Sequence, residues 1–365
     1  MTDPGNMNRA NEGRGPVPVL RWILAALGAL TLSSCYVTTQ GTRYLSLLSR
    51  AERVERILSD PDASPEIKDL VVRAERIRSF AIQEFGLADT RNYRSVVRLD
   101  SDALATVVSA CDAVSFRRHL WKYPVVGDLP YKGFFKPAEA EREAARLRGE
   151  GLDVLVRTVD AFSTLGWLPD PLFSTFSRYD DGQLAELILH ELAHATVFVK
   201  GAEQFNEEFA TFVGRQGALR YLARVHGDPS SELAAFQDAR TDADAFAAFL
   251  RETADRLETL YGSGRPREEI LSGKAEILAA RARDYRETAS VRFRSEDYRV
   301  FPMDRINNAY LDLYRLYEGE PEVYGEYLDS VCGGDLSLFV RKVKDLAGNR
   351  GDPKDAIRKA IRGLP

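Results

Sequence analysis

The chain has 365 residues, of which 44% are hydrophobic and 29% are charged, and its 55 acidic residues outnumber 50 basic ones for a net charge of −5. This composition excludes a collagen-like or wholly disordered chain, and the acidic balance argues against a protein that binds nucleic acid. Three cysteines are too few for a disulfide-based scaffold.

Residues 1–34 have the pattern of a bacterial export signal. A segment with several arginines precedes the uncharged run Trp22–Leu32, which is too short to span a bilayer but suits the hydrophobic part of a signal peptide. Leu32-Ser33-Ser34-Cys35 then resembles a bacterial lipobox, and this resemblance implies cleavage before Cys35 and lipidation of that residue. We therefore expect a protein anchored in the membrane through its N-terminal lipid and facing the periplasm. Tyr36, in place of Asp, favours the outer membrane. A plain signal peptide or a short membrane anchor is the alternative.

The first half of the remaining chain predicts helices and a few strands. Apolar residues at helical spacing indicate helices over 46–57 and 65–85, and a charged, Ala-rich helix over 137–150 ends at Gly151. Extended segments are expected over 96–99, 129–135 and 152–159. The Gly- and Pro-rich stretch 161–176 predicts a loop or an edge strand, and its part 161–173 could pair with an extended peptide.

The second half is expected to be helical throughout. Helices are predicted over 183–199, 206–225, 307–317 and 335–345, and a long antiparallel pair over 231–261 and 267–289 is separated by a Gly- and Pro-rich turn. The basic tail 346–365 is expected to fray. The fold class is therefore mainly α, of the α+β type, with a long antiparallel helical hairpin.

The segment His190-Glu191-Leu192-Ala193-His194 forms an HExxH motif inside the helix predicted over 183–199. Residues four apart lie one turn apart on the same helix face, so both imidazoles can reach one ion, and neutral imidazole is a good Zn²⁺ ligand. Glu191 projects about 100° away from His190 and can act as a general base without being a ligand. The alternative is a helix that carries two histidines and no metal.

Asn206-Glu207-Glu208-Phe209-Ala210 opens the next helix and resembles the NExxA element of gluzincin metallopeptidases. The resemblance implies that Glu207 is the third ligand of one Zn²⁺ ion. Twelve residues separate His194 from Glu207, fewer than in many gluzincins. The alternative is that Glu207 binds no metal and is present because the positive end of the helix dipole favours an acidic residue.

The helix face that carries Glu207 also favours it over Glu208. Its neighbours on that face are small, which predicts a close approach of another helix; these neighbours are Ala210, Thr211, Gly214 and Ala218. Glu208 lies between the small face and the apolar face, where solvent or an ion pair is expected.

A wider stretch resembles the predicted zinc aminopeptidase lipoproteins of Gram-negative bacteria. The segments involved are Ala161–Trp167, Asp170-Pro171, Glu186–His194, Phe205–Glu207 and Phe209-Ala210, together with Tyr131–Phe135 and Asn307–Ala309. The resemblance implies a gluzincin-like core with a small sheet beside the HExxH helix. It also implies a zinc-dependent peptidase acting on peptide substrates, and the aminopeptidase activity is a prediction at the level of the family.

Two alternatives to an aminopeptidase stay open. One is a zinc endopeptidase or another zinc hydrolase. The other is a non-catalytic envelope lipoprotein with a structural metal site, against which Glu191 argues because such a site needs no base. In each case we expect one domain over 35–365, with an N-terminal helical part (36–150), a zinc core (151–228), the helical hairpin (229–290) and C-terminal helices (291–365).

Four further residues are candidates for special roles. Tyr310 and Tyr314, one helical turn apart, are candidate hydrogen-bond donors to a tetrahedral oxyanion, with packed aromatics as the alternative. Cys111 and Cys332 remain once Cys35 is lipidated. In an oxidising compartment they form either a disulfide or two buried free thiols.

Overall fold

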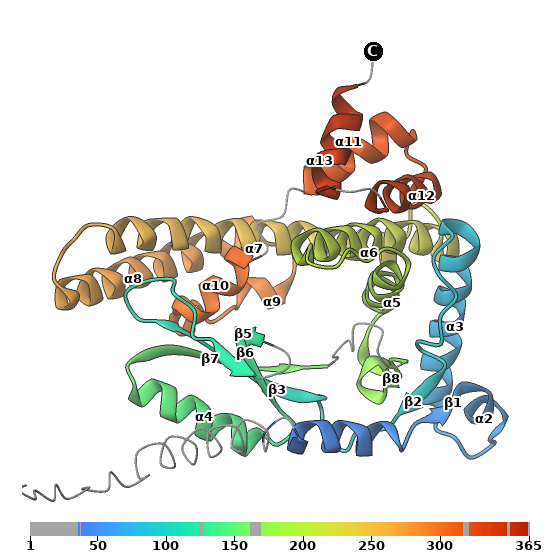
Figure 1. Cartoon of the computed structure of the whole chain (residues 1–365), viewed down its shortest axis with the longest axis horizontal. Helices are drawn as coiled ribbons and strands as arrows, with labels where there is room; N and C mark the ends of the chain where they lie inside the picture. Colours follow the sequence, from blue (N-terminus) through green and yellow to red (C-terminus); the bar gives the residue numbers. More distant parts are fainter. Residues whose placement is uncertain are drawn as a thin grey trace, which may run out of the picture.

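The computed structural model describes residues 36, 38–123, 127–160, 169–316, 321–348 and 351–363. The predicted signal 1–34, Cys35 and most of the segment 161–173 lie outside these residues. In the described part, helices predominate and the strands form three small sheets (Figure 1). The expectation of a mainly α fold of the α+β type is therefore confirmed.

The elements follow one another along the chain in two groups. The first group holds the strands: β1 (Glu52–Arg53), α2 (Val54–Ser59), α3 (Pro65–Phe85), β2 (Ser95–Val97), β3 (Ala105–Asp112), β4 (Trp121–Tyr123), β5 (Gly127–Leu129), β6 (Tyr131–Phe134), α4 (Pro137–Gly149), β7 (Leu152–Val159) and β8 (Leu172–Phe173). The second group is helical: α5 (Asp181–Thr196), α6 (Glu203–His226), α7 (Ser231–Tyr261), α8 (Arg267–Arg292), α9 (Glu296–Arg299), α10 (Asn308–Leu316), α11 (Pro321–Cys332), α12 (Leu336–Ala347) and α13 (Pro353–Arg362). Short 3₁₀ turns lie at Ser174–Arg178 and Met303–Arg305.

The central sheet has the order β6-β3-β7 and is antiparallel, with Val108 opposite both Lys132 and Val156. α4 covers one face, where Ala140, Ala144 and Leu147 pack against Val108. β3 was not predicted. Its residues are buried in succession rather than alternately, so the strand lacks the period-two pattern that marks a half-exposed strand.

The predicted hairpin is present as α7 and α8, which extend together to one side of the molecule (Figure 1). Its aromatic core includes Phe246, Phe249 and Tyr285, and α10 packs against α7 beside it. A larger core joins α3, α5 and α6 to the C-terminal helices.

The helices differ from the prediction in three places. The helix expected over 46–57 is interrupted at 49–53, where β1 pairs with β2 before α2 begins. α11 was not predicted at all. The tail expected to fray forms α13, because Asp352 caps its first turn and Ile357 is fully buried against the C-terminal helices.

The disulfide alternative for Cys111 and Cys332 is also wrong in this structure, since both are buried free thiols. Cys111 lies on β3 in the central sheet, whereas Cys332 ends α11 at the opposite side of the molecule (Figure 1). A disulfide requires Cα atoms within about 7 Å, and two separately packed parts of the fold do not provide this.

None of the helices among the described residues is both long enough and apolar enough to cross a membrane.

Candidate metal centre

The HExxH motif lies on α5, whose start is fixed by a capping box. The Asp180 side chain accepts a hydrogen bond from the Gln183 amide at 2.7 Å, and the Gln183 side chain accepts one from the Asp180 amide at 3.2 Å. The apolar face of α5 is fully buried through Leu184, Ile188 and Leu192. The helix is thereby held with its histidines on the remaining, partly open face.

The structure brings together the two histidines and the glutamate that the sequence predicted as ligands. The Nε2 atoms of His190 and His194 lie 3.0 Å apart, and Glu207 places Oε2 3.7 Å from His190 Nε2 and Oε1 3.4 Å from His194 Nε2. A tetrahedral ion with bonds of about 2.0–2.1 Å separates its ligand atoms by about 3.3–3.4 Å. The observed separations lie around this value, so the three side chains could hold one small tetrahedral ion, and among the described residues they form the group able to hold a metal.

The electrostatics of the group also suit a divalent cation. Burial lowers the pKa of His190 below its ordinary value, and the neighbouring His194 lowers it further against the opposing charge of Glu207. The hydrogen bond with His194 lowers the pKa of Glu207, although burial acts in the other direction. His190 is thus favoured as the neutral imidazole and Glu207 as the ionised carboxylate, which are the forms that bind metal ions.

α5 and α6 approach closely because of the small-residue face predicted on α6. A Cβ atom added at Gly214 would lie 2.9 Å from the carbonyl oxygen of Glu186 and 3.2 Å from Cβ of His190. Ala210 and Ala218 on the same face are fully buried. The predicted close approach is confirmed, and it is what lets the Glu207 carboxylate reach the histidines of α5.

Asn206 has a structural role that its place in the motif did not reveal. Its side chain is buried and bonds both backbone groups of Val199: Oδ1 accepts from the amide at 2.9 Å and Nδ2 donates to the carbonyl at 2.8 Å. Val199 belongs to the connection between the two helices that carry the predicted ligands. Asn206 therefore fixes this connection directly beside Glu207.

Glu208 does not face the histidines. Its carboxylate lies 3.0 Å from Lys354 Nζ and accepts a hydrogen bond from the Tyr324 hydroxyl at 2.9 Å. Its side chain is 9% exposed, against 51% for Glu207. The ion pair expected for Glu208 is present, but it is buried rather than solvated.

Glu191 lies on α5 next to His190 and is partly buried. The pKa of the fully buried Tyr93 phenol is raised well above its ordinary value, first by burial and then by the charges of Glu191 and Asp170. Tyr93 is the one non-glycine residue with a positive φ, 62°, in the described part of the chain. Glu191 is thus bordered by a buried polar region that includes Asp170, a residue of the motif noted in the sequence.

The tyrosine candidates lie elsewhere. Tyr310 and Tyr314 stack with ring centroids 5.6 Å apart, and their contacts are with Phe301 and Phe246 in the hairpin core. None of their described contacts reaches the three predicted ligands. Tyr131, on β6, is 43% exposed.

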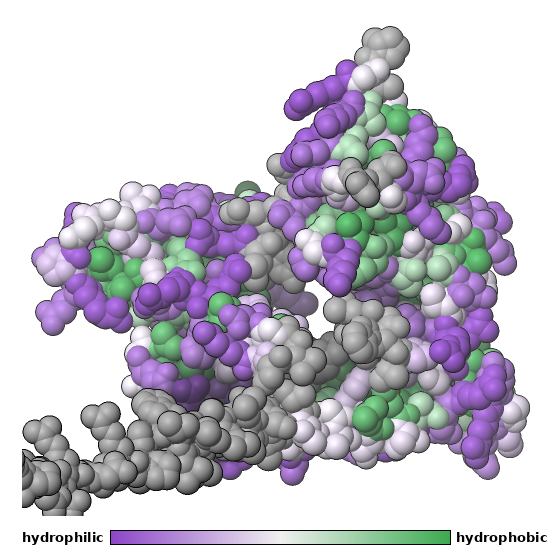
Figure 2. All heavy atoms as spheres, viewed as in Figure 1, coloured by the Kyte–Doolittle hydropathy of each residue, from purple (hydrophilic) through white to green (hydrophobic). Residues whose placement is uncertain are grey.

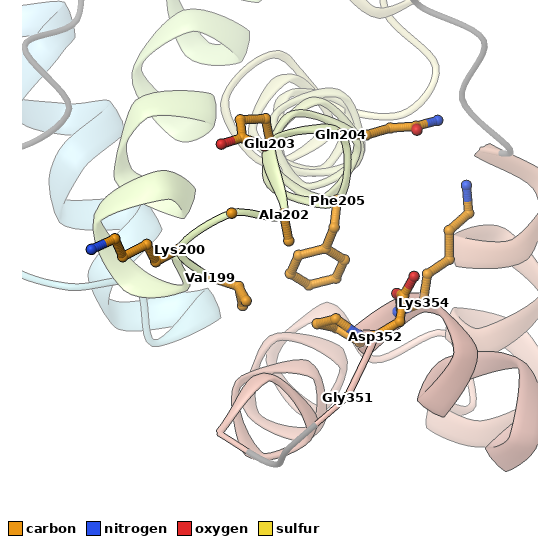
Figure 3. A pocket seen from close by; sticks show the side chains of 11 residues that line it. Val199, Lys200, Ala202, Glu203, Gln204, Phe205, Gly351, Asp352 and Lys354 are labelled. Carbon is orange, nitrogen blue, oxygen red and sulfur yellow. Dashed lines mark hydrogen bonds between the residues drawn. The ribbon is translucent and has the colours of Figure 1, made fainter. Parts of the chain in front are cut away.

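A cavity of about 410 Å³ opens at the start of α6, between residues 199–205 and residues 351–354 (Figure 3). Phe205 points into it, and Gln204 and Lys354 lie at its other side (Figure 3). The predicted ligands do not line this cavity, so it is distinct from the candidate metal centre.

Comparison with protein-family models gives a match over residues 35–357 to a family described as "Putative aminopeptidase". Comparisons with curated proteins and with solved structures give no significant match.

Proposed function

Because the chain belongs to the "Putative aminopeptidase" family, we propose that it is a zinc-dependent aminopeptidase that hydrolyses the first peptide bond of peptide substrates. The observation that carries the zinc assignment is the convergence of His190, His194 and Glu207, whose ligand atoms lie within 4.8 Å of one another. Two imidazoles and one carboxylate are the ligand set of many catalytic zinc sites, which keep a fourth position open.

In this proposal His190, His194 and Glu207 would hold one Zn²⁺ ion. When bound, the ion would supply a Lewis acid that polarises the scissile carbonyl and makes a water acidic enough to react near neutral pH. Glu191 would accept the proton of the attacking water and return it to the leaving amine. Its carboxylate suits this role because it follows His190 on the helix but lies outside the group of three ligands.

The experiment uses purified protein, amino-acyl reporter substrates with a free amine, and internally quenched peptides with blocked N-termini. We expect hydrolysis of the amino-acyl reporters, loss of activity with a chelator, and recovery on adding zinc. Cleavage of the blocked peptides alone would instead identify an endopeptidase. No hydrolysis by the zinc-loaded protein would favour another zinc hydrolase or a structural metal site.

We also propose that the protein is a lipoprotein, anchored through Cys35 and facing the periplasm from the outer membrane. The basis is the sequence pattern of residues 1–35. Cys35→Ala should abolish labelling with a fatty-acid analogue and prevent cleavage before residue 35. Unchanged labelling would refute this anchor without affecting the zinc proposal.

A further inference from the structure

Glu207 has no support from other side chains in the described part of the chain beyond the two histidines. Its side chain is 51% exposed. Its position therefore depends on how the first turns of α6 are held. Neighbouring side chains on a helix project about 100° apart, so a group that holds Glu208 also sets the direction of Glu207.

Glu208 is held from three sides. Lys354 Nζ lies 3.0 Å from both carboxylate oxygens, the Tyr324 hydroxyl donates to Oε2 at 2.9 Å, and Gln204 Nε2 donates to Oε1 at 2.9 Å. The side chains of Glu208 and Lys354 are only 9% and 12% exposed, and Tyr324 is fully buried. A charge pair this well buried has a defined geometry, because either partner alone would be an uncompensated charge.

The groups that hold Glu208 come from the end of the chain. Tyr324 lies on α11 and Lys354 in the first turn of α13, 146 residues from Glu208. The neighbouring helix α12 adds apolar contact to α6, where Phe339 packs against Phe209 and Phe212. Figure 2 shows hydrophobic side chains where the C-terminal helices meet α6.

At the start of α6, by contrast, the junction contains a cavity. The cavity of about 410 Å³ separates residues 199–205 from residues 351–354, and Gln204 and Lys354 form part of its wall (Figure 3). The polar contacts to Glu208 therefore connect the first turns of α6 to α13 across a partly open junction.

We propose that the C-terminal helices belong functionally to the metal centre, with Lys354 and Tyr324 as positioning residues that act on Glu207 through Glu208. The proposal rests on the proposed zinc site. Rotating α6 by about 10° moves a carboxylate about 6 Å from the helix axis by about 1 Å. Zinc sites keep their ligand distances within about 0.2 Å, so loss of the Glu208 contacts weakens metal binding.

The test measures the zinc dissociation constant of the full chain by competition with a chelator, and checks folding by circular dichroism. Lys354→Met should weaken zinc binding about tenfold or more, as the loss of supporting groups does at other zinc sites. Lys359→Met, on the exposed side of the same helix, is the matched control and should bind as the wild type does. Glu208→Gln combined with Lys354→Met should recover only part of the affinity, because the uncompensated charge is gone but the Lys354 contact is still missing, and full recovery would overturn the positioning role of Lys354.

A folded Lys354→Met variant with wild-type zinc affinity would overturn the proposal. If Lys354→Met does not fold, Tyr324→Phe decides, because it removes one hydrogen bond to Glu208 and keeps the ring. It should bind zinc several-fold more weakly, and unchanged affinity would overturn the proposal. A wild-type chain that binds no zinc would instead refute the proposed zinc site itself, so the two failures are distinguishable.

Discussion

Glu191 and Glu207 are both acids beside the histidines, but they occupy different positions relative to them. Glu207 approaches both imidazoles within 3.7 Å. Glu191 follows His190 on the helix and is not a member of the group that could hold a metal. Its charge acts on the buried phenol of Tyr93 instead. Under the proposed function, this arrangement suits metal binding by Glu207 and proton transfer by Glu191.

This division predicts the behaviour of Glu191→Gln. The variant keeps the shape and hydrogen-bonding capacity of the side chain but cannot accept a proton, so turnover should fall at least about a hundredfold. Zinc content, measured by native mass spectrometry, should stay at one ion per chain. Loss of zinc in this variant would show that Glu191 supports the site rather than the reaction.

At the scale of elements, the contact between α5 and α6 depends on Gly214. Gly214→Ala would place a Cβ atom 2.9 Å from a backbone oxygen of α5, which no side-chain movement can relieve. We expect the helices to separate, with a loss of about 1–3 kcal/mol of stability and weaker zinc binding. Thermal unfolding and chelator competition measure the two effects.

The matched control is Gly325→Ala on α11, where an added Cβ atom meets nothing within 4 Å. Alanine in an open helical position stabilises by about 0.5–1 kcal/mol relative to glycine. If both variants changed stability alike, the close approach at Gly214 would not be the cause.

The packing of α4 on the central sheet predicts a pH dependence of stability. Burial alone would raise the pKa of Glu143, but hydrogen bonds from Arg146 and Trp121 and the charge of Lys132 outweigh it and lower the pKa from 4.5 to about 2. A carboxyl whose pKa is lower in the folded state stabilises the fold above pH 4.5, and this contribution is lost as the pH falls toward 2.

Glu143→Gln should therefore lower the melting temperature at pH 7, with a loss of about 2 kcal/mol after allowance for solvent screening. The difference from the wild type should shrink as the pH falls from 4.5 toward 2. Glu141→Gln, whose side chain is 62% exposed on the same helix, is the control and should differ little at any pH. If the difference in melting temperature between Glu143→Gln and the wild type stayed constant with pH, the lowered pKa of Glu143 would be contradicted.

At the scale of the whole molecule, a buried polar cluster joins the helical hairpin and α10 to the central sheet. Lys274 of α8 pairs with Asp153 of β7 and donates to the Ala113 carbonyl at 2.9 Å. Asn308 lies at the start of α10. Its backbone N–H donates a hydrogen bond to the Asp153 carboxylate at 2.8 Å, and its side-chain oxygen accepts one from the Tyr261 hydroxyl at 2.8 Å. The Asn307–Ala309 segment noted in the sequence therefore contributes Asn308 to this cluster.

Lys274→Met should therefore destabilise the whole fold. Lys274 is 7% exposed, and its loss leaves Asp153 with one fewer compensating partner, which we expect to cost about 3 kcal/mol. Chemical unfolding measures this, with the exposed Arg283→Met on the same helix as a control that should change stability by less than about 0.5 kcal/mol. Equal stability of Lys274→Met and the wild type would show that the cluster does not hold these parts together.

Features that depend on short spacing could be predicted from the order of residues alone. The i, i+4 histidines, the helical periodicity of α5 to α8 and the small face that carries Glu207 arise within a few helical turns, because helix geometry relates neighbouring side chains directly. The hairpin and the mainly helical fold class were predictable for the same reason.

Features that depend on distant contacts could not be predicted in this way and are visible only in the folded chain. β3 lacks an alternating sequence pattern because residues on both of its faces are buried. α13 forms because Ile357 and Lys354 contact residues of other helices. Cys111 and Cys332 remain unpaired because the fold packs them in separate places. Burial and pairing of this kind depend on which segments meet, and residues as far apart as Glu208 and Lys354 meet only when the whole chain has packed.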